Sequence, residues 1–278
     1  MSTDNLDLIF LGSSGAILVP SFHCSCRTCE KARKDPKLQR TRASALIRGK
    51  ENILIDASPD MEFQLEREGI RYIDRIFITH WHYDHCWGLA PFPELGSHGI
   101  WEKKIFDLYL PEQDLKYFDN LGFSWAKFRY DIHPVKPGDI IKLPDSTFEV
   151  VKTTHSPDSV GYIITTPNKM FAYLVDGVVP PEETINRLKE LELDFIVLES
   201  TLDDLILPEG VRWYSFSLSE AVAFWKTLNV PKCILTHASF HSWNIDKLIA
   251  GITPAEREAF VMKNPGLSFA YDGLKLGL

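Results

Sequence analysis

Long apolar runs and a surplus of basic residues are both missing from this sequence. No run approaches the roughly 20 apolar residues that a membrane-spanning helix needs, so we expect no membrane partner. The formal net charge is −8, which argues against a general nucleic-acid binder because such proteins normally show a basic face. The acidic start, Met1 to Asp7, leads directly into an apolar stretch, unlike a secretory signal peptide. These absences indicate a cytoplasmic protein, with nucleic acid not the expected partner.

Cysteines are few and unevenly placed. There are five, an odd number, and three of them stand together in residues 23–30, which we call the cysteine loop. This pattern favours metal binding in a reducing compartment over a disulfide framework. The thiols of Cys24, Cys26 and Cys29 can converge on one tetrahedral structural zinc if a fourth ligand arrives from elsewhere. His241 is the first choice for that ligand and His23 the second, while free loop thiols or a redox pair are the alternatives.

A dense cluster of potential metal ligands occupies the stretch from Thr79 to Gly88. Directly before it, residues 75–78 form a short apolar run that predicts a buried strand. Three imidazoles and one carboxylate then fall within six residues: His80, His82, Asp84 and His85. Buried polar groups cost free energy unless they are paired, and ligation of a metal ion would pair them. A metal site is therefore a better interpretation than a chance cluster on a solvated loop.

Three predicted strands of the second half repeat this arrangement, since each ends in a metal-binding residue type. They are residues 147–155, 169–176 and 233–237, ending in His155, Asp176 and His237. A lone histidine is usually structural, but three strand ends of the same kind strengthen one another. The predicted strand over residues 52–56 ends in Asp56, where a carboxylate can orient a metal-binding histidine without touching the metal.

The remaining segments predict a mixed chain of ordinary globular composition, 45% hydrophobic and 24% charged. Residues 217–229 predict an amphipathic helix that starts with a capping box, with Ser217 as N-cap and Glu220 three residues later. The aromatic-rich insert, residues 90–137, could cover the active site, pack as ordinary core, or form the contact of a homodimer. Gly12-Ser13-Ser14-Gly15 predicts a tight turn rather than a nucleotide-binding loop, because the lysine of a P-loop is missing.

The order of these ligands resembles the pattern of the metallo-β-lactamase superfamily across nearly the whole chain. The pattern consists of His80-x-His82-x-Asp84-His85, His155, Asp176 and His237. The resemblance implies an α/β (α+β) fold, a four-layer αββα sandwich with its site at one edge between two sheets, and a single domain over residues 1–278. It also implies that His80, His82 and His155 hold one divalent ion. Asp84, His85 and His237 would hold the other, and Asp176 would bridge them. Zinc and manganese both suit these ligands, and iron is a third option.

Three further motifs are similar to the branch that contains the cyclic-phosphate phosphodiesterase of phosphonate breakdown. They are Cys24-x-Cys26-x-x-Cys29, Leu235-Thr236-His237 and Tyr271-Asp272-Gly273-Leu274. In that branch a histidine three residues after the last ligand completes the structural zinc site. Here Phe240 fills that place and His241 follows one residue later.

A second departure from the branch concerns proton transfer. The resemblance implies a histidine just before the helix near Ser217, as proton donor to the leaving oxygen. Ser215 occupies its place in this sequence, so we expect Asp84 and Ser215 to be the catalytic positions beyond metal binding. Tyr214 or Arg212 could substitute as donor. General-acid help typically contributes about 10²–10⁴-fold to a rate.

The sequence thus leads to a dinuclear metal hydrolase acting on a small phosphodiester, with cyclic phosphodiesters included. Two alternatives stay open. One is a hydrolase of a carboxylic ester, thioester or lactone, because the same metal pair can attack carbonyl carbon. The other is a catalytically silent metal-binding accessory protein. The absence of the proton-donating histidine favours this alternative.

Overall fold

Two mixed sheets form the centre of the molecule. The computed structural model describes residues 6–92, 105–120, 127–156, 159–201, 214–238 and 254–278. The first sheet has the strand order β14-β1-β2-β3-β4-β5-β6, and the second has the order β13-β12-β11-β10-β9-β8-β7. The strands of the first sheet are β1 (Asp7–Gly12), β2 (Ser44–Arg48), β3 (Asn52–Ile55), β4 (Arg75–Phe77), β5 (Phe106–Pro111), β6 (Tyr130–Val135) and β14 (Lys275–Gly277). Those of the second are β7 (Ile140–Lys142), β8 (Thr147–Lys152), β9 (Val160–Thr165), β10 (Met170–Leu174), β11 (Phe195–Glu199), β12 (Cys233–Thr236) and β13 (Leu267–Phe269).

The strand directions decide where polar strand ends can meet. In the second sheet β10, β11, β12 and β13 are parallel neighbours. Strand β9 is antiparallel to both β8 and β10, so β8 runs in the direction of β10. In the first sheet β3, β4, β5 and β6 are parallel neighbours. Because parallel strands end at the same edge of a sheet, the carboxyl ends of β8, β10, β11 and β12 gather at one edge.

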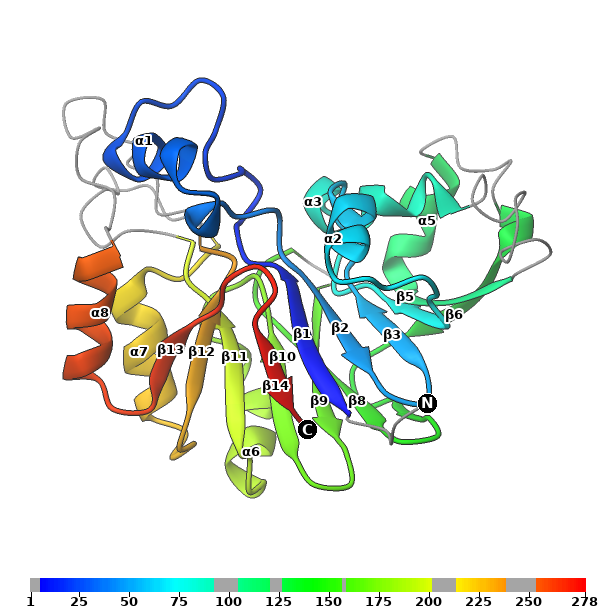
Figure 1. The fold of residues 1–278 in the computed structure, drawn as a ribbon. Coiled ribbons are helices and arrows are strands. Elements are labelled where there is room, and N and C mark those ends of the chain that lie inside the picture. Colours follow the sequence, from blue (N-terminus) through cyan, green and yellow to red (C-terminus); the bar gives the residue numbers. More distant parts are fainter. Residues whose placement is uncertain (1–5, 93–104, 121–126, 157–158, 202–213, 239–253) are drawn as a thin grey trace.

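Helices cover the outer faces of both sheets, which gives four layers (Figure 1). The α-helices are α1 (Arg27–Lys34), α2 (Met61–Arg67), α3 (Tyr83–Cys86), α5 (Leu115–Asn120), α6 (Glu182–Glu190), α7 (Leu218–Lys226) and α8 (Pro254–Lys263). Short 3-10 helices are η1 (Pro36–Leu38), η2 (Trp87–Leu89), η4 (Glu112–Asp114) and η6 (Lys127–Arg129). Apolar residues of α2, α3 and α5 pack on the first sheet, and those of α6, α7 and α8 pack on the second. The αββα fold expected from the sequence is confirmed.

An aromatic core holds the two sheets together close to the end of β4. The ring of Phe77 stacks on Tyr109 at 4.3 Å and on Phe148 at 4.2 Å between ring centroids, so it joins strands of both sheets. The hydroxyl of Tyr162 donates to the carbonyl of Ile78 at 2.7 Å, and the amide of Val160 donates to the carbonyl of Thr79 at 2.9 Å. The second sheet therefore fixes the backbone that follows β4, which is the segment that carries the histidine cluster.

The segment directly after β1 is held by backbone contacts and leaves no room for a side chain at Gly12. A Cβ on Gly12 would lie 1.9 Å from the carbonyl oxygen of Arg42. The amides of Ser13 and Ser14 both donate to the carbonyl of Thr41, at 3.0 and 2.8 Å. The tight turn expected over residues 12–15 is therefore not present: Ser14 pairs with Arg42 in an isolated bridge, and the chain bends only at residues 16–17.

Most predicted elements appear in the structure. The β2–β3 and β9–β10 hairpins are present, and α7 begins with the capping box of Ser217 and Glu220. The three-residue strands β7, β13 and β14 were not predicted, since so few residues show no periodicity. The insert contains β5 and the helical segments η4 and α5, while residues 93–104 and 121–126 lie outside the described ranges. Among the described helices, none is both long enough and apolar enough to cross a bilayer.

Candidate metal centre

The histidine cluster follows β4 in an extended conformation and then turns into α3. The alternation of an extended chain sends His80 and His82 toward the centre, while Trp81 packs outward against Phe118. His82 is the N-cap residue of α3, with extended backbone angles of −86° and 150°. The first turn of α3 then supplies the next two candidates. All seven ligand candidates of the sequence meet at this edge: His80, His82, Asp84, His85, His155, Asp176 and His237.

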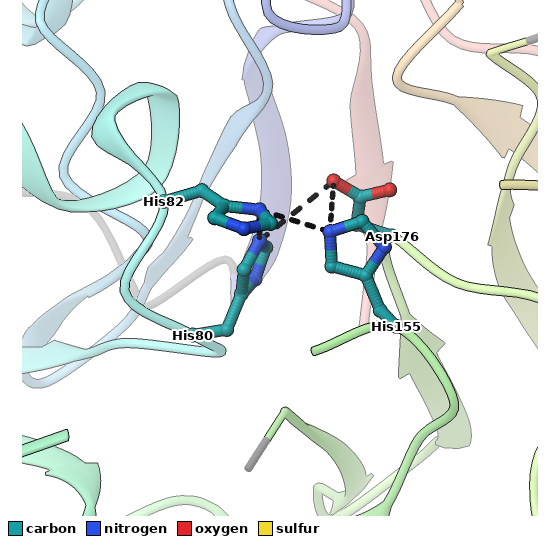
Figure 2. Close-up of side chains that lie close together, drawn as sticks. All are labelled: His80, His82, His155 and Asp176. Atoms are coloured by element: carbon teal, nitrogen blue, oxygen red, sulfur yellow. Dashed lines mark hydrogen bonds and ion pairs between the residues drawn. The ribbon is translucent and has the colours of Figure 1, made fainter. Parts of the chain in front are cut away.

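The first group of ligand atoms comes from His80, His82, His155 and Asp176 (Figure 2). The Nε2 atoms of His80 and His155 each lie 2.9 Å from Nδ1 of His82. Oδ2 of Asp176 lies 3.3 Å from the same His155 nitrogen and 3.7 Å from that of His80. Three ring nitrogens and one carboxylate oxygen therefore face one point, which is the donor set of a tetrahedral metal site.

The second group consists of Asp84, His85, Asp176 and His237. Nε2 of His85 and Nε2 of His237 are 3.3 Å apart, and each lies 3.5 Å from Oδ2 of Asp84. Each also lies 3.5 Å from Oδ2 of Asp176. The same oxygen of Asp176 is thus shared by both groups, as a carboxylate between two adjacent cations would be.

The outer nitrogens of four of the histidines are held by oxygen atoms of neighbouring residues. These contacts are His80 Nδ1 to Thr79 Oγ1 (3.0 Å), His85 Nδ1 to Asp56 Oδ2 (2.8 Å), His155 Nδ1 to the Tyr214 carbonyl (2.7 Å) and His237 Nδ1 to Thr201 Oγ1 (2.7 Å). A carbonyl or carboxylate can only accept, so His85 and His155 carry a proton on Nδ1, which leaves Nε2 as the nitrogen that can bind a metal. Such partners orient metal-binding imidazoles. The residues therefore fit a pair of divalent ions, and their role as ligands stays a prediction.

The backbone is strained at two of the ligand candidates and at Asp56, the partner of His85. Asp56, Asp176 and His237 have φ angles of 61°, 70° and 53°, although none is glycine. Each follows a strand closely, and the left-handed conformation turns its side chain toward the site. Residues in such conformations cost about 1–3 kcal/mol each and persist where the surroundings fix them. Asparagine tolerates this conformation well, so Asp→Asn substitutions here leave the backbone unchanged.

The two groups differ in how tightly they hold protons. Burial and the nearby His85 hold the pKa of His80 well below its ordinary value, and burial beside His155 also lowers that of His82. Burial alone would lower the pKa of His85, but Asp84 and Asp56 raise it well above 6.5. For His237, Asp176 and Asp84 likewise outweigh burial and raise the pKa.

This difference predicts two steps of metal release on acidification. An ion in the second group must displace protons from His85 and His237, whose raised pKa values keep them protonated to higher pH. As pH falls from about 8 to about 5, the second group should therefore lose its ion first and the first group later. Manganese is the suitable probe because the thiolates of the cysteine loop bind it poorly.

Manganese content after dialysis at each pH measures this, with Asp84→Asn as the comparison. That variant lacks a ligand of the second group only, so it should show the low-pH step alone. A single step in the unsubstituted protein would contradict the difference between the groups.

Asp56 is a buried carboxylate that fixes which ring nitrogen of His85 carries a proton. Its Oδ1 accepts from the amide of Thr79 at 2.8 Å, and its Oδ2 accepts from His85 Nδ1. In Asp56→Asn the amide NH₂ can donate to that nitrogen, which would move the ring proton to the metal-facing Nε2. We expect metal affinity to fall about 10–100-fold, as for other losses of a partner behind a ligand. Competition with a chromogenic chelator measures this, and an unchanged affinity would show that Asp56 does not orient His85.

Glu199 is a member of the site that sequence analysis missed. It ends β11, is fully buried, and accepts from the amide of Phe216 at 2.6 Å and from the amide of Thr201 at 2.8 Å. The Thr201 hydroxyl contacts both Glu199 and the ring of His237. Burial and the negative charge of Asp176 raise the pKa of Glu199 to about 8. The available signal was a strand that ends in an acidic residue, as the strands before Asp56 and Asp176 do.

Ser215, the second expected catalytic position, lies beside the shared carboxylate. Its hydroxyl donates to Oδ1 of Asp176 at 3.4 Å. The other catalytic candidate, Asp84, is buried, which alone would raise its pKa. The charges of His85 and His237 outweigh burial and lower the pKa to about 2, so Asp84 is a carboxylate throughout the neutral range.

The three thiols of the cysteine loop also converge. Cys24, Cys26 and Cys29 are buried and their sulfur atoms lie within 4.8 Å of one another, beside α1. Burial raises the pKa of Cys29 to about 12. His23, the second choice for a fourth ligand, instead places Nδ1 3.0 Å from the Ser21 hydroxyl and is not part of this group. His241, the first choice, lies outside the described residues.

Two packed sheets with helices outside and a histidine-aspartate centre at their edge define a metallo-β-lactamase fold. A family model described as "Beta-lactamase superfamily domain" matches residues 51–238, and the chain belongs to this superfamily of hydrolases. The solved structure of a "New Diphosphatase from the PhnP Family" is 27% identical, with a TM-score of 0.79 over 98% of this chain and 96% of that one. The family and the branch suggested by the sequence are confirmed.

Two further relatives of similar sequence have names that state other activities. The octanoyltransferase of Porphyromonas gingivalis is 26% identical over 280 residues, which cover 96% of this chain and 50% of that protein. The ribonuclease Z of Nocardia farcinica is 31% identical over 140 residues, 48% of this chain and 46% of that protein. The matches thus span about half the length of these relatives.

Proposed function

We propose that this protein is a dinuclear metal-dependent phosphodiesterase of small substrates, cyclic ones included. The observation that carries the proposal is the shared Oδ2 of Asp176, which lies 3.3–3.7 Å from imidazole nitrogens of both ligand groups. When bound, a pair of zinc or manganese ions would activate water and neutralise charge on a phosphate. His80, His82 and His155 would hold one ion, Asp84, His85 and His237 the other, and Asp176 both.

Among the described ligand candidates, the exposed side chains mark a direction of substrate entry. His80, Asp84, His85, Asp176 and His237 are buried, whereas His82 is exposed and His155 partly exposed. The substrate would therefore approach over His82 and His155. There the ionised Asp84 would accept a hydrogen bond from the attacking water and orient it. Thr79, Asp56 and Thr201, behind the ligands, would keep the imidazoles in place.

Chemistry and charge both support a small phosphorus substrate. The names of the similar diphosphatase and of ribonuclease Z each state action on a phosphate compound. Two divalent ions would reverse the local charge of an acidic chain and attract a phosphate anion. The net charge of −8 favours a small molecule over RNA as the substrate. We further propose that Cys24, Cys26 and Cys29 hold a structural zinc, with His241 as fourth ligand, and that the protein is cytoplasmic.

A second candidate is hydrolysis of a carboxylic ester, thioester or lactone. The specific observation in its favour is the match of 96% of this chain to half of a protein named octanoyltransferase. The same pair of ions can polarise a carbonyl group. The missing histidine at position 215 would also matter less for a thiolate, which is a good leaving group.

The deciding experiment measures hydrolysis of bis(p-nitrophenyl) phosphate by zinc-loaded and by manganese-loaded protein. Parallel reactions contain p-nitrophenyl octanoate, an octanoyl thioester and a short RNA. Asp84→Asn is the matched control, because it removes one ligand and keeps the size of the side chain. We expect turnover of the phosphodiester that disappears in the control. Turnover of only the carbonyl esters, or no turnover with both ions bound, would overturn the proposal.

A further inference from the structure

A charged side chain outside both ligand groups lies buried beside the end of β12. Arg40 is 5% exposed, and its guanidinium donates to three backbone carbonyls, those of Ser13 (3.5 Å), Ala238 (3.2 Å) and Ala270 (3.1 Å). Burial and the nearby Arg257 lower the pKa of Arg40 to about 9, so it keeps its charge at neutral pH. Burying a charge costs free energy unless it is paired and hydrogen-bonded. The three carbonyls therefore indicate what this arginine holds in place.

One of these carbonyls belongs to the residue that directly follows His237. The φ angle of His237 is 53°, a conformation that persists only where the surroundings fix it. The carbonyl of His237 accepts from the Thr201 hydroxyl at 3.0 Å, and the amide of Ala238 donates to the carbonyl of Ser13 at 2.8 Å. Arg40 bonds the carbonyls of both Ser13 and Ala238, so it completes the contacts that restrain the backbone after His237.

Asp272 of the motif Tyr271-Asp272-Gly273-Leu274 fixes the surroundings of this arginine. Its carboxylate accepts from the hydroxyl of Ser13 at 2.8 Å, and from the amide and the hydroxyl of Thr41 at 2.8 and 2.6 Å. Ser13 supplies one of the carbonyls that the guanidinium bonds, and Thr41 is the residue after Arg40. The motif thus holds both the arginine and one of its acceptors.

The backbone of Arg40 is fixed as well, at the base of the segment that carries the cysteine loop. Val19 and Arg40 exchange backbone hydrogen bonds of 3.0 and 2.7 Å, and the cysteine loop and α1 lie between these two residues. Arg40 therefore joins the base of this segment to the strand end that carries His237.

From these contacts we infer that Arg40 is a positioning residue of the metal centre: its guanidinium holds His237 in the left-handed conformation that turns the imidazole toward Asp84 and His85. Nε2 of His237 lies 3.5 Å from Oδ2 of Asp84 and 3.3 Å from Nε2 of His85. Relaxation of the backbone at His237 would therefore open the second ligand group. The inference rests on the role of His237 as a metal ligand, which is part of the proposed function.

The first test follows two backbone amides by hydrogen exchange in the metal-free, full-length protein. The amide of Ala238 lies next to His237, whereas the amide of Val160 donates to the carbonyl of Thr79 beside the first ligand group. Arg40→Lys keeps the charge but replaces the two-nitrogen fork by one nitrogen. In this variant Ala238 should exchange at least about tenfold faster, while Val160 keeps its rate. Equal acceleration of both amides would show a general loss of stability and overturn the inference.

The second test measures manganese binding, with the free ion counted by electron paramagnetic resonance. Arg40→Lys should weaken binding at the second ligand group about 10–100-fold, the usual effect of losing a partner behind a ligand, and leave the first group unchanged. In protein that also carries Asp84→Asn, which lacks a ligand of the second group, Arg40→Lys should cause no further loss. Full affinity at both groups in Arg40→Lys, or a further loss in the Asp84→Asn background, would overturn the inference.

Arg187→Lys is the matched control, because it makes the same chemical change on α6. Arg187 bonds the carboxylate of Glu149 there at 2.7 and 2.9 Å. This variant should keep the exchange rates of both amides and the manganese affinities of both groups.

A measurement on the wild-type protein decides the matter even if Arg40→Lys does not fold. Because Arg40 rather than a metal ion restrains the backbone, the amide of Ala238 should already be protected from exchange in the metal-free protein. Protection that appears only after manganese is added would overturn the inference.

The outcomes separate this inference from the proposed function. No turnover of any phosphorus substrate by protein with both ions bound would overturn the phosphodiesterase proposal and leave the role of Arg40 standing. No manganese binding by the wild-type protein would overturn the proposed metal centre and, with it, this inference.

Discussion

Asp176→Asn protein is expected to fold normally, to bind fewer than two ions at the centre, and to lose at least about 10³-fold in kcat/KM. The reason is that one oxygen of Asp176 faces both ligand groups. An amide has no negative charge to share between two cations. Loss of several kcal/mol of charge stabilisation corresponds to that factor in rate. The φ angle of 70° suits asparagine, so the backbone should not change.

Asp194→Asn is the matched control for this substitution. Asp194 pairs with Lys169 before the amino end of β11, whereas the metal centre lies at the carboxyl ends of the strands. It should keep two ions and the wild-type rate. Metal content by inductively coupled plasma mass spectrometry and kcat/KM on bis(p-nitrophenyl) phosphate measure both proteins. Two tightly bound ions in Asp176→Asn would show that this carboxylate does not bridge the groups.

Phe77→Ala should lower the free energy of unfolding by about 3–5 kcal/mol, the usual range for a buried phenylalanine. Phe77 has no exposed surface and stacks on Tyr109 and Phe148, so its removal leaves a cavity between the two sheets. His80 lies three residues after Phe77 on the same segment of the chain. We therefore also expect weaker metal binding at the first ligand group.

Phe63→Ala provides the comparison, because Phe63 lies on α2 with 83% of its surface exposed. Its effect should stay within about 0.5 kcal/mol, as for most surface substitutions. Urea denaturation of the metal-free proteins gives both values. Equal effects of the two substitutions would mean that the inter-sheet aromatic core does not stabilise the fold as described.

The seven ligand candidates could be picked out from the sequence because four of them stand at the ends of apolar strands and the other three follow His80 within five residues. His80, His155, Asp176 and His237 each interrupt a pattern that otherwise indicates burial, and Asp56 does the same. Strand direction then brings these ends to one edge. This is a local signal with a simple spatial consequence.

The partners behind the ligands could not be predicted in the same way. Glu199 ends its strand like the others, yet its contact with the amide of Phe216 depends on a segment more than ten residues further along the chain. The positive φ angles at Asp176 and His237 could not be predicted from the sequence, because aspartate and histidine usually adopt negative φ angles. Tertiary packing decides such features.

The most direct test of the two-ion centre is anomalous diffraction from crystals of zinc-loaded protein at the zinc absorption edge. The geometry predicts two neighbouring peaks at this edge of the sheets. One should lie within about 2.2 Å of nitrogens of His80, His82 and His155, a normal zinc–ligand distance. The other should lie equally close to ligand atoms of His85 and His237, with Asp176 contacting both. A single peak, or peaks away from these side chains, would contradict the account.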